Sequence, residues 1–94
     1  MDFSSESFIW DIEKETENIK KHGVDFLTAT RAFKNEGRKI YRDTGHSTDE
    51  ERLFCLGMVD GRVLTVRFLY RQGKIRIFGA GYWRKGGKIY AKEN

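Results

Sequence analysis

Residues 53–82 read LFCLGMVDGRVLTVRFLYRQGKIRIFGAGY, three apolar runs that two short polar turns separate. In chain order the segments are 53–59, Asp60-Gly61, 62–70, Gln72-Gly73 and 74–82. Asp-Gly is a strong signal for a two-residue hairpin, because both central residues of such a turn take positive φ. These residues therefore predict a three-stranded antiparallel meander.

Strand alternation sorts the side chains of this meander onto two faces, because successive residues of a strand point to opposite sides. The face expected to pack on helices carries Leu53, Cys55, Gly57, Val59, Leu64, Val66, Phe68, Tyr70, Ile75, Ile77, Gly79 and Gly81. The opposite face is expected to place Arg67 across from Phe78, Leu69 across from Arg76, Arg71 beside Lys74, and Val63 near Tyr82. A buried surface would not hold that many charges, so this second face is predicted to meet solvent.

The chain before the meander predicts one short strand followed by two helices. The strand covers residues 7–10, which are aromatic and β-branched. The first helix is expected to begin after Asp11 as its N-cap and to end at Gly23. The second is expected to begin at Asp25 and to end near residues 35–37.

Two further segments are short. Residues 39–42 are predicted as a strand within a polar stretch, and residues 83–92 as a final helical turn or a tail, since adjacent Gly86 and Gly87 disfavour a helix. The fold class expected for residues 1–94 is α+β, a single domain. Two N-terminal helices pack on one face of an antiparallel sheet, and a short C-terminal helix or tail follows.

Charge is distributed unevenly along the chain. The net charge is +4, but residues 1–51 carry 8 basic and 12 acidic side chains, whereas residues 52–94 carry 10 basic and 2 acidic ones. A basic half suits a phosphate backbone, from which Lys and Arg displace condensed counterions, and it would equally suit an acidic partner. The alternative is a solvated basic face that only keeps the protein soluble.

Cysteine usage and hydropathy exclude several classes of protein. Cys55 is the one cysteine, which excludes an internal disulfide and a thiolate cluster for structural zinc. Its apolar neighbours favour a small buried hydrophobe over a nucleophile. No apolar run approaches the roughly 20 residues of a membrane span, and the first residues lack the basic and apolar regions of a signal peptide. We therefore expect a cytoplasmic protein that binds no membrane and uses no metal or other cofactor.

The basic half interleaves cations with aromatic residues. Cations bind phosphate and aromatic rings stack bases, a combination typical of single-stranded RNA binding. The alternative is an amphipathic sheet with solvated arginines. The residues concerned are Arg67, Arg71, Lys74, Arg76, Arg84, Lys85 and Lys88, with Tyr82, Trp83 and Tyr90.

Cleavage of RNA without a metal would need a base for the 2′-hydroxyl, a cation for the phosphate and an acid for the leaving oxygen. The candidates for proton transfer are Glu50, Glu51, His22, His46, Tyr82 and Tyr90, and the residues alone do not choose among them. His22 closes a predicted helix, where the helix dipole favours its charged form, so capping is the preferred interpretation there. His46 lies in a polar loop and is expected to be merely exposed.

The order of these motifs resembles the BrnT family, the toxin half of BrnT/BrnA-type toxin-antitoxin pairs and a relative of RelE-like ribonucleases. The resemblance covers residues 8–90, and its most specific part runs from Trp10-Asp11 to Lys21-His22-Gly23-Val24. The matching residues are Phe8-Ile9-Trp10-Asp11, Lys14, Asn18, Lys21-His22-Gly23-Val24, Phe26, Glu50-Glu51-Arg52, Asp60-Gly61-Arg62-Val63-Leu64 and Arg76-Ile77.

The resemblance implies a RelE-like fold and a metal-independent endoribonuclease that inhibits translation. It also implies neutralisation by a cognate, DNA-binding, BrnA-like antitoxin in a hetero-oligomer that represses its own operon. The catalytic positions expected here are Arg71, Arg76, Glu51 (or Glu50), Arg84 and Tyr90. The RNA-binding positions expected beside them are Arg67, Lys74, Tyr82, Trp83, Lys85 and Lys88.

One segment departs from the family pattern. Most members have Ile-Ser-Ala-Arg where this chain has Phe78-Gly79-Ala80-Gly81, and a charged helix where it has Gly86-Gly87. Either Arg67 and Tyr82-Trp83 supply a replacement surface, or the chain is a non-catalytic RNA- or partner-binding module with the same fold. A ribonuclease toxin is the preferred hypothesis.

Overall fold

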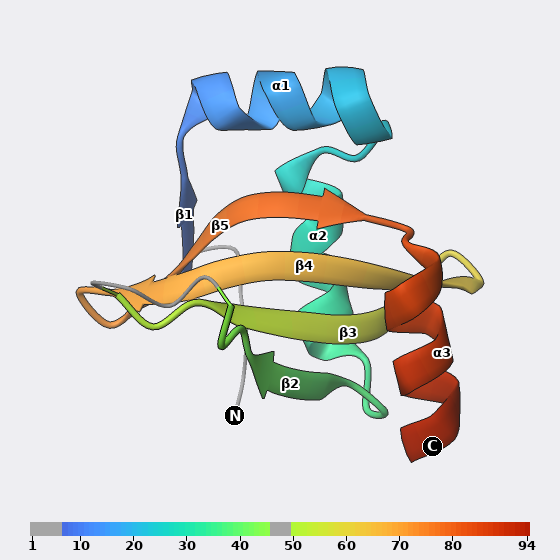
Figure 1. The fold of residues 1–94 in the computed structure, drawn as a ribbon. Coiled ribbons are helices and arrows are strands. Elements are labelled where there is room, and N and C mark those ends of the chain that lie inside the picture. Colours follow the sequence, from blue (N-terminus) through green and yellow to red (C-terminus); the bar gives the residue numbers. More distant parts are fainter. Residues whose placement is uncertain (1–6, 46–49) are drawn as a thin grey trace.

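A computed structural model describes residues 7–45 and 50–94. Its sheet has five strands in the order β1-β5-β4-β3-β2, with β1 parallel to β5 and all other neighbours antiparallel (Figure 1). The elements are β1 (Phe8–Trp10), α1 (Ile12–His22), α2 (Phe26–Thr30), the 3₁₀ helix η2 (Arg31–Lys34), β2 (Lys39–Arg42), β3 (Leu53–Val59), β4 (Arg62–Arg71), β5 (Lys74–Gly81) and α3 (Arg84–Glu93). The predictions of an α+β class and of the meander are confirmed. The prediction of a purely antiparallel sheet was wrong, because β1 is parallel to β5.

The local signals for the first two helices are confirmed. Asp11 caps α1 by accepting hydrogen bonds from the backbone amides of Glu13 and Lys14, and Gly23 ends it with φ of 70°. Asp25 caps α2 through the amide of Thr28. These caps form because a short acidic side chain can satisfy amides that the first helical turn leaves unpaired.

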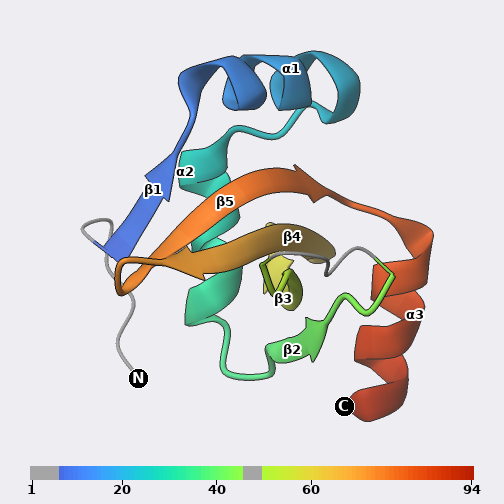
Figure 2. The same ribbon diagram turned by 60° about the vertical axis from the view of Figure 1, so that its left-hand side comes forward.

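Helix α1 lies along the edge of the sheet and not on its face, which corrects the expectation that both N-terminal helices cover one face (Figures 1 and 2). Strand β1 pairs only with Ile75–Ile77, so the rest of that edge of β5 has no neighbouring strand. The buried Asn18 amide takes the place of a strand there, accepting from the Ala80 amide at 3.1 Å and donating to the Ala80 carbonyl at 2.9 Å.

The main core lies between the sheet and α2 with η2. Phe33 from η2 meets Phe8 and Phe68 edge to face, with ring centroids 5.2 and 5.0 Å away. Phe26 and Ile77 are also fully buried there. Helix α3 covers one end of the opposite face, which we call the outer face (Figure 2). The predicted C-terminal helix or tail is therefore a helix of ten residues.

A β-bulge in β5 changes which residues face the core. Phe68 pairs with Ile77, but Arg67 pairs with Gly79, so Phe78 is an extra residue. A bulge shifts the alternation of side chains by one position. Ala80 is therefore fully buried in the core, and the expectation that Gly79 and Gly81 would face the helices was wrong.

Cys55 is buried in the core, as predicted. Burial raises the pKa of its thiol to about 12. The thiol therefore stays protonated at neutral pH, which removes it from the candidate nucleophiles.

Among the described residues, no helix has the length and apolar character that crossing a membrane requires.

We expect the native protein to resist alkylation at Cys55. The shift from 9.0 to about 12 lowers the thiolate population at pH 8 by about 1000-fold. Iodoacetamide labelling followed by mass spectrometry should therefore be at least about 1000-fold slower in buffer than in denaturant. A labelling rate in buffer that is within about 10-fold of the rate in denaturant would contradict the burial of this thiol.

Candidate nucleic-acid interface

Two arginines meet one aromatic ring in the middle of the outer face. The guanidinium carbons of Arg67 and Arg52 lie 5.1 and 5.3 Å from the ring centroid of Phe78. This cation–π contact can hold the Arg67 guanidinium in place while its N–H groups stay available for phosphate. Arg76 lies across from Leu69 on the same face, and no ion pair of Arg76 is found in the described part of the chain. Lys74 lies further along, beside Arg71.

Two of the expected catalytic residues are held by oppositely charged neighbours. The Arg71 Nη2 atom lies 2.7 Å from the Oε1 atom of Glu50. Glu51 pairs instead with Arg42, at 3.3 Å between Oε2 and Nε. Both pairs are exposed, and both lie at the end of the sheet that α3 does not cover. The charge of each arginine is thus partly compensated before any ligand binds.

The expected catalytic residues Arg84 and Tyr90 belong to α3, at the other end of the sheet. The α3 helix packs on Thr65, six positions along β4 from Arg71, which corresponds to about 20 Å. The Tyr90 hydroxyl donates to the Asn35 Oδ1 atom at 2.7 Å and so anchors α3 to the loop before β2. The structure therefore does not bring the five expected catalytic residues together around one phosphate.

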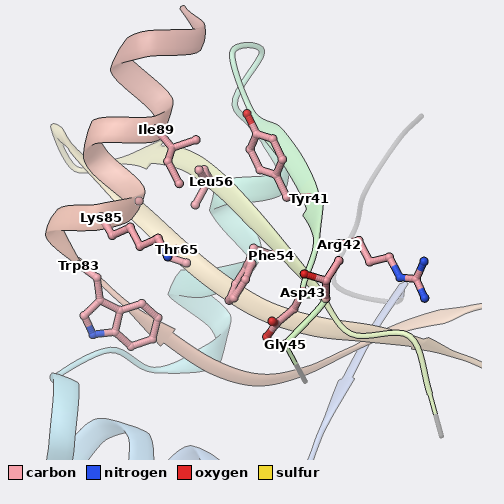
Figure 3. Close-up of a pocket in the computed structure, with 12 residues that line it drawn as sticks. Tyr41, Arg42, Asp43, Gly45, Phe54, Leu56, Thr65, Trp83, Lys85 and Ile89 are labelled. Atoms are coloured by element: carbon pink, nitrogen blue, oxygen red, sulfur yellow. The ribbon is translucent and has the colours of Figure 1, made fainter. Parts of the chain in front are cut away.

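An apolar groove lies on the outer face between β2 and α3, with a volume of about 700 Å³ (Figure 3). Phe54, Leu56 and Thr65 form its floor, and Trp83 and Ile89 line the α3 side. Lys85 lies at its rim, whereas Arg84 and Lys88 extend from other positions of α3. A groove that combines aromatic rings with a basic rim can receive nucleobases.

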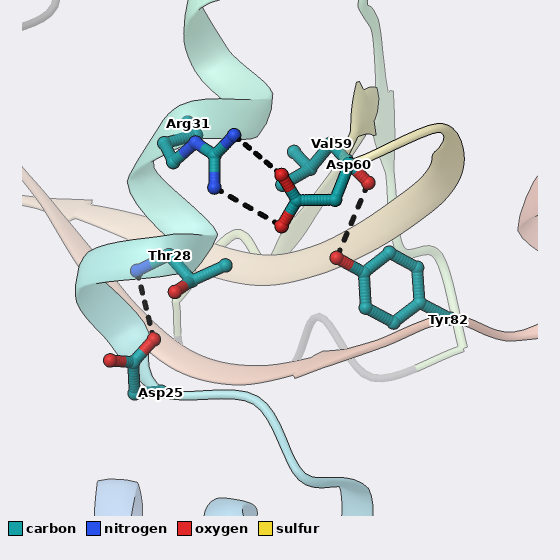
Figure 4. Close-up of polar contacts among 6 residues, drawn as sticks. All are labelled: Asp25, Thr28, Arg31, Val59, Asp60 and Tyr82. Carbon is teal, nitrogen blue, oxygen red and sulfur yellow. Dashed lines mark hydrogen bonds and ion pairs between the residues drawn. The ribbon is translucent and has the colours of Figure 1, made fainter.

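Tyr82 lies on the core face, which corrects the expected place beside Val63 on the outer face. Its hydroxyl donates to the Val59 carbonyl at 3.3 Å (Figure 4). The guanidinium carbon of Arg62 lies 3.9 Å from its ring centroid. The bulge explains this place, because it moves Ala80 and every second residue after it to the core side.

A bidentate ion pair lies beside Tyr82. The Arg31 guanidinium donates to both Asp60 carboxylate oxygens, at 2.8 and 3.2 Å, which holds the pKa of Asp60 below its usual range (Figure 4). This pair joins η2 to the β3–β4 turn. The contacts around Tyr82 are therefore those of a packing residue and not of an exposed stacking platform.

A smaller, polar pocket of about 150 Å³ lies between α1 and β5, and we call it the α1–β5 pocket. Trp83 lines both this pocket and the apolar groove, so the two are neighbours. The residues that line the pocket are Lys14, Glu17, Asn18, Lys21 and His22 from α1, with Arg67, Phe78, Gly79 and Trp83. In residues 7–45 and 50–94, no group of three or more His, Cys, Asp or Glu side chains is arranged to hold a metal ion.

Sequence reasoning missed the contribution of α1 and of apolar residues on the outer face. Lys14, Asn18 and Lys21 recur at helical spacing, so their common face was a signal available in the sequence. Phe54 was not among the residues assigned to the outer face. Phe78 was expected there, directly across from Arg67, but the bulge makes it an extra residue and pairs Arg67 with Gly79. Of the expected RNA-binding residues, Arg67 and Trp83 meet at the α1–β5 pocket.

Comparison with known proteins gives one family. The model of the family described as "Ribonuclease toxin, BrnT, of type II toxin-antitoxin system" matches residues 10–86. The matched range includes strands β2 to β5, helices α1 and α2, and the last residue of β1. A search of curated proteins found no match.

Proposed function

We propose a function from the premise that this chain belongs to the BrnT family, the ribonuclease toxins of type II toxin-antitoxin systems. The finer proposal is that it cleaves single-stranded RNA in the cytoplasm without a metal ion and so inhibits translation. A BrnA-like, DNA-binding antitoxin neutralises it in a hetero-oligomer. Residues 1–94 act as one domain, and the mixed sheet with a helical layer supports assigning it a RelE-like fold.

The observation that carries this proposal is the arrangement of cations and rings on the outer face. Arg67 and Arg76 project from adjacent strands of that face, and Phe78 and Trp83 lie beside Arg67. Guanidinium groups can stabilise the charge that develops on a phosphate under attack by the neighbouring 2′-hydroxyl. Aromatic rings can hold the unstacked bases on either side.

Two of the glycines that suggested a non-catalytic module, Gly81 and Gly86, have packing functions. A Cβ atom on Gly81 would lie 2.5 Å from Cε2 of Trp83, so the indole ring covers the place of a side chain at residue 81. A Cβ atom on Gly86 would overlap the Thr65 hydroxyl, so glycine permits the approach of α3 to β4. Packing therefore accounts for glycine at both positions, and in this proposal Arg67 and Trp83 supply the replacement surface.

The test is induction of the chain alone in bacteria, followed by cleavage assays of purified protein in EDTA. We expect growth arrest, RNA fragments, and cleavage that EDTA leaves unchanged. Arg67→Ala should lower the cleavage rate by about 100-fold, because one stabilising cation is removed. Lys92→Ala removes a cation from the last turn of α3 and should change nothing.

Intact transcripts and normal growth would overturn the nuclease and favour the non-catalytic binding module. In that case affinity for single-stranded RNA should still fall linearly with the logarithm of salt concentration. Cleavage that EDTA abolishes would reject metal independence alone. Co-expression with the product of a neighbouring DNA-binding antitoxin gene should restore growth and yield a stable complex, and free toxin in such cells would reject the partner.

A further inference from the structure

We propose that the α1–β5 pocket is the site where this ribonuclease binds the phosphate it cleaves, with His22 as the general base. The proposal rests on the ribonuclease function above and assigns its chemistry to α1, outside the five positions that the family resemblance implied. His22 was one of the candidates for proton transfer, although capping of α1 was the preferred interpretation there. The substrate class is single-stranded RNA, with one phosphate in the pocket and a neighbouring base in the apolar groove.

The pocket gathers cations from two elements that are far apart in sequence. Lys14 and Lys21 lie two turns apart on one face of α1, and Arg67 faces them from β4. Asn18 lies between the two lysines on that face and bonds to both backbone groups of Ala80. These buried hydrogen bonds fix the face of α1 that meets β5, and with it the two lysines.

Positive charge exceeds negative charge in the pocket, where Lys14, Lys21 and Arg67 meet one carboxylate. Glu17 is the one acidic residue among those that line it. In the part of the chain that the structure describes, Lys14, Lys21 and Arg67 form no ion pair, whereas Arg71 pairs with Glu50 at 2.7 Å. Unpaired cations in a concave site attract an anion more strongly than cations that a carboxylate already neutralises.

The pocket has the size of a small anion. Its volume of about 150 Å³ is about five times that of one liquid water molecule, and below the range of pockets for drug-sized ligands. Gly79 contributes backbone alone to its wall, and a Cβ atom there would lie 3.4 Å from the Cδ atom of Arg67. The missing side chain thus leaves room for a phosphate beside Arg67.

The imidazole of His22 is positioned by an aromatic ring. The Trp83 indole lies over Gly81, and the His22 ring meets it edge to face at 5.1 Å between centroids and 88° between planes. No carboxylate pairs with His22 among the described residues, and the charged groups around it are Lys14, Glu17, Lys21 and Arg67. An imidazole that no carboxylate holds can accept a proton from a hydroxyl group hydrogen-bonded to it.

The reaction can then be written with all atoms accounted for. His22 takes the proton of the 2′-hydroxyl, and the 2′-oxygen forms a bond to the adjacent phosphorus. The bond from phosphorus to the 5′-oxygen breaks, and that oxygen takes a proton from water, leaving a 2′,3′-cyclic phosphate and a 5′-hydroxyl end. The imidazolium returns its proton to water. Lys14, Lys21 and Arg67 stabilise the negative charge on the phosphate oxygens during the attack.

Trp83 links this chemistry to substrate choice. Because it lines both the pocket and the apolar groove, a base next to the bound phosphate can stack in the groove while the phosphate stays in the pocket. A base inside a duplex could not reach the groove without unstacking, so single-stranded RNA is the expected substrate.

The experiment compares His22→Gln, Lys21→Gln and the control Lys20→Gln in cleavage and binding. Lys20 neighbours Lys21 on α1 but does not line the pocket. Single-turnover cleavage of a single-stranded RNA is measured in EDTA, and binding is measured with a 2′-deoxy analogue that cannot be cleaved. His22→Gln should lower the cleavage rate at least about 100-fold and leave analogue affinity within about 3-fold.

Two further readouts separate a catalytic function from a structural one. The wild-type rate should fall at low pH as the base becomes protonated, and His22→Gln should lose this dependence. Lys21→Gln should weaken analogue binding and lower the salt slope by about 0.7, the value for one phosphate contact on a single strand. Lys20→Gln should match the wild type in every assay.

The outcomes distinguish the two proposals. If the wild type cleaves RNA and His22→Gln cleaves within about 3-fold of it, the pocket is not the catalytic site, although the ribonuclease function stands. If Lys21→Gln and Lys20→Gln bind the analogue alike, the pocket does not hold the phosphate. If the wild type cleaves no RNA, the proposed function fails and this inference fails with it.

Discussion

Replacing Gly57 with alanine is expected to lower the free energy of unfolding by at least about 3 kcal/mol. A Cβ atom on Gly57 would lie 2.8 Å from the Cα and carbonyl carbon of Ala32 and closer still to its carbonyl oxygen, all backbone atoms of η2. The whole 3₁₀ helix must therefore shift, and Phe33 must move from between Phe8 and Phe68. Thermal unfolding by circular dichroism should show a midpoint lower by at least about 12 °C.

The matched control is Gly87→Ala, the same chemical change in a place with no atom within 4 Å of the new Cβ. Gly87 lies inside α3, where alanine is the better helix former by about 1 kcal/mol. This variant should therefore unfold at a higher temperature than the wild type. A midpoint for Gly57→Ala within about 3 °C of the wild type would contradict the packing of η2 on β3.

The parts of the fold that sequence predicted depend on residues adjacent in the chain. Asp60 and Gly61 have φ of 53° and 79°, and Gln72 and Gly73 have 53° and 75°, as two-residue hairpins require. The N-caps of α1 and α2 likewise join a side chain to an amide two or three positions away. Such features need no knowledge of the tertiary structure.

The parts that sequence could not predict depend on pairing between distant residues. Alternation predicts two faces for β5, but the place of the extra residue Phe78 is set by the register with β4. One bulge therefore explains why Ala80 is buried in the core and why Tyr82 lies on the core side. Asn18 was visible as a polar residue on a helix, but its hydrogen-bond partner Ala80 is 62 positions away.

For the candidate site, too, the sequence predicted some features and could not predict those that depend on distant residues. The sequence indicated the sign of the charge and the outer face as its location, and Arg67 and Trp83 do meet beside a pocket. It did not indicate which cations are already paired, because Glu50 reaches Arg71 across 21 positions of the chain. It also placed all the candidate cations of the functional surface within residues 52–94, whereas Lys14 and Lys21 belong to the acidic half of the chain.

The second large effect is expected at Gly86, where alanine should lower the free energy of unfolding by about 2–3 kcal/mol. The new Cβ atom would overlap the Thr65 hydroxyl and lie 3.2 Å from the Cδ2 atom of Leu56, so α3 would have to move away from β4. Because Trp83 directly precedes α3 and lines the apolar groove, affinity for single-stranded RNA should fall as well.

This effect should be reversible by a second substitution, unlike that of Gly57→Ala, where the obstacle is backbone. The Thr65 hydroxyl is buried and has no hydrogen-bond partner among the described residues, so Thr65→Ala alone should cost about 1 kcal/mol or less. In that background the nearest atoms to a Cβ on residue 86 are 3.2 and 3.4 Å away, which small shifts can accommodate. The double variant should recover most of the lost stability, a coupling of about 1–3 kcal/mol measurable by a double-mutant cycle of urea unfolding. Additive effects would show that the cost of Gly86→Ala arises elsewhere than at the contact between α3 and β4.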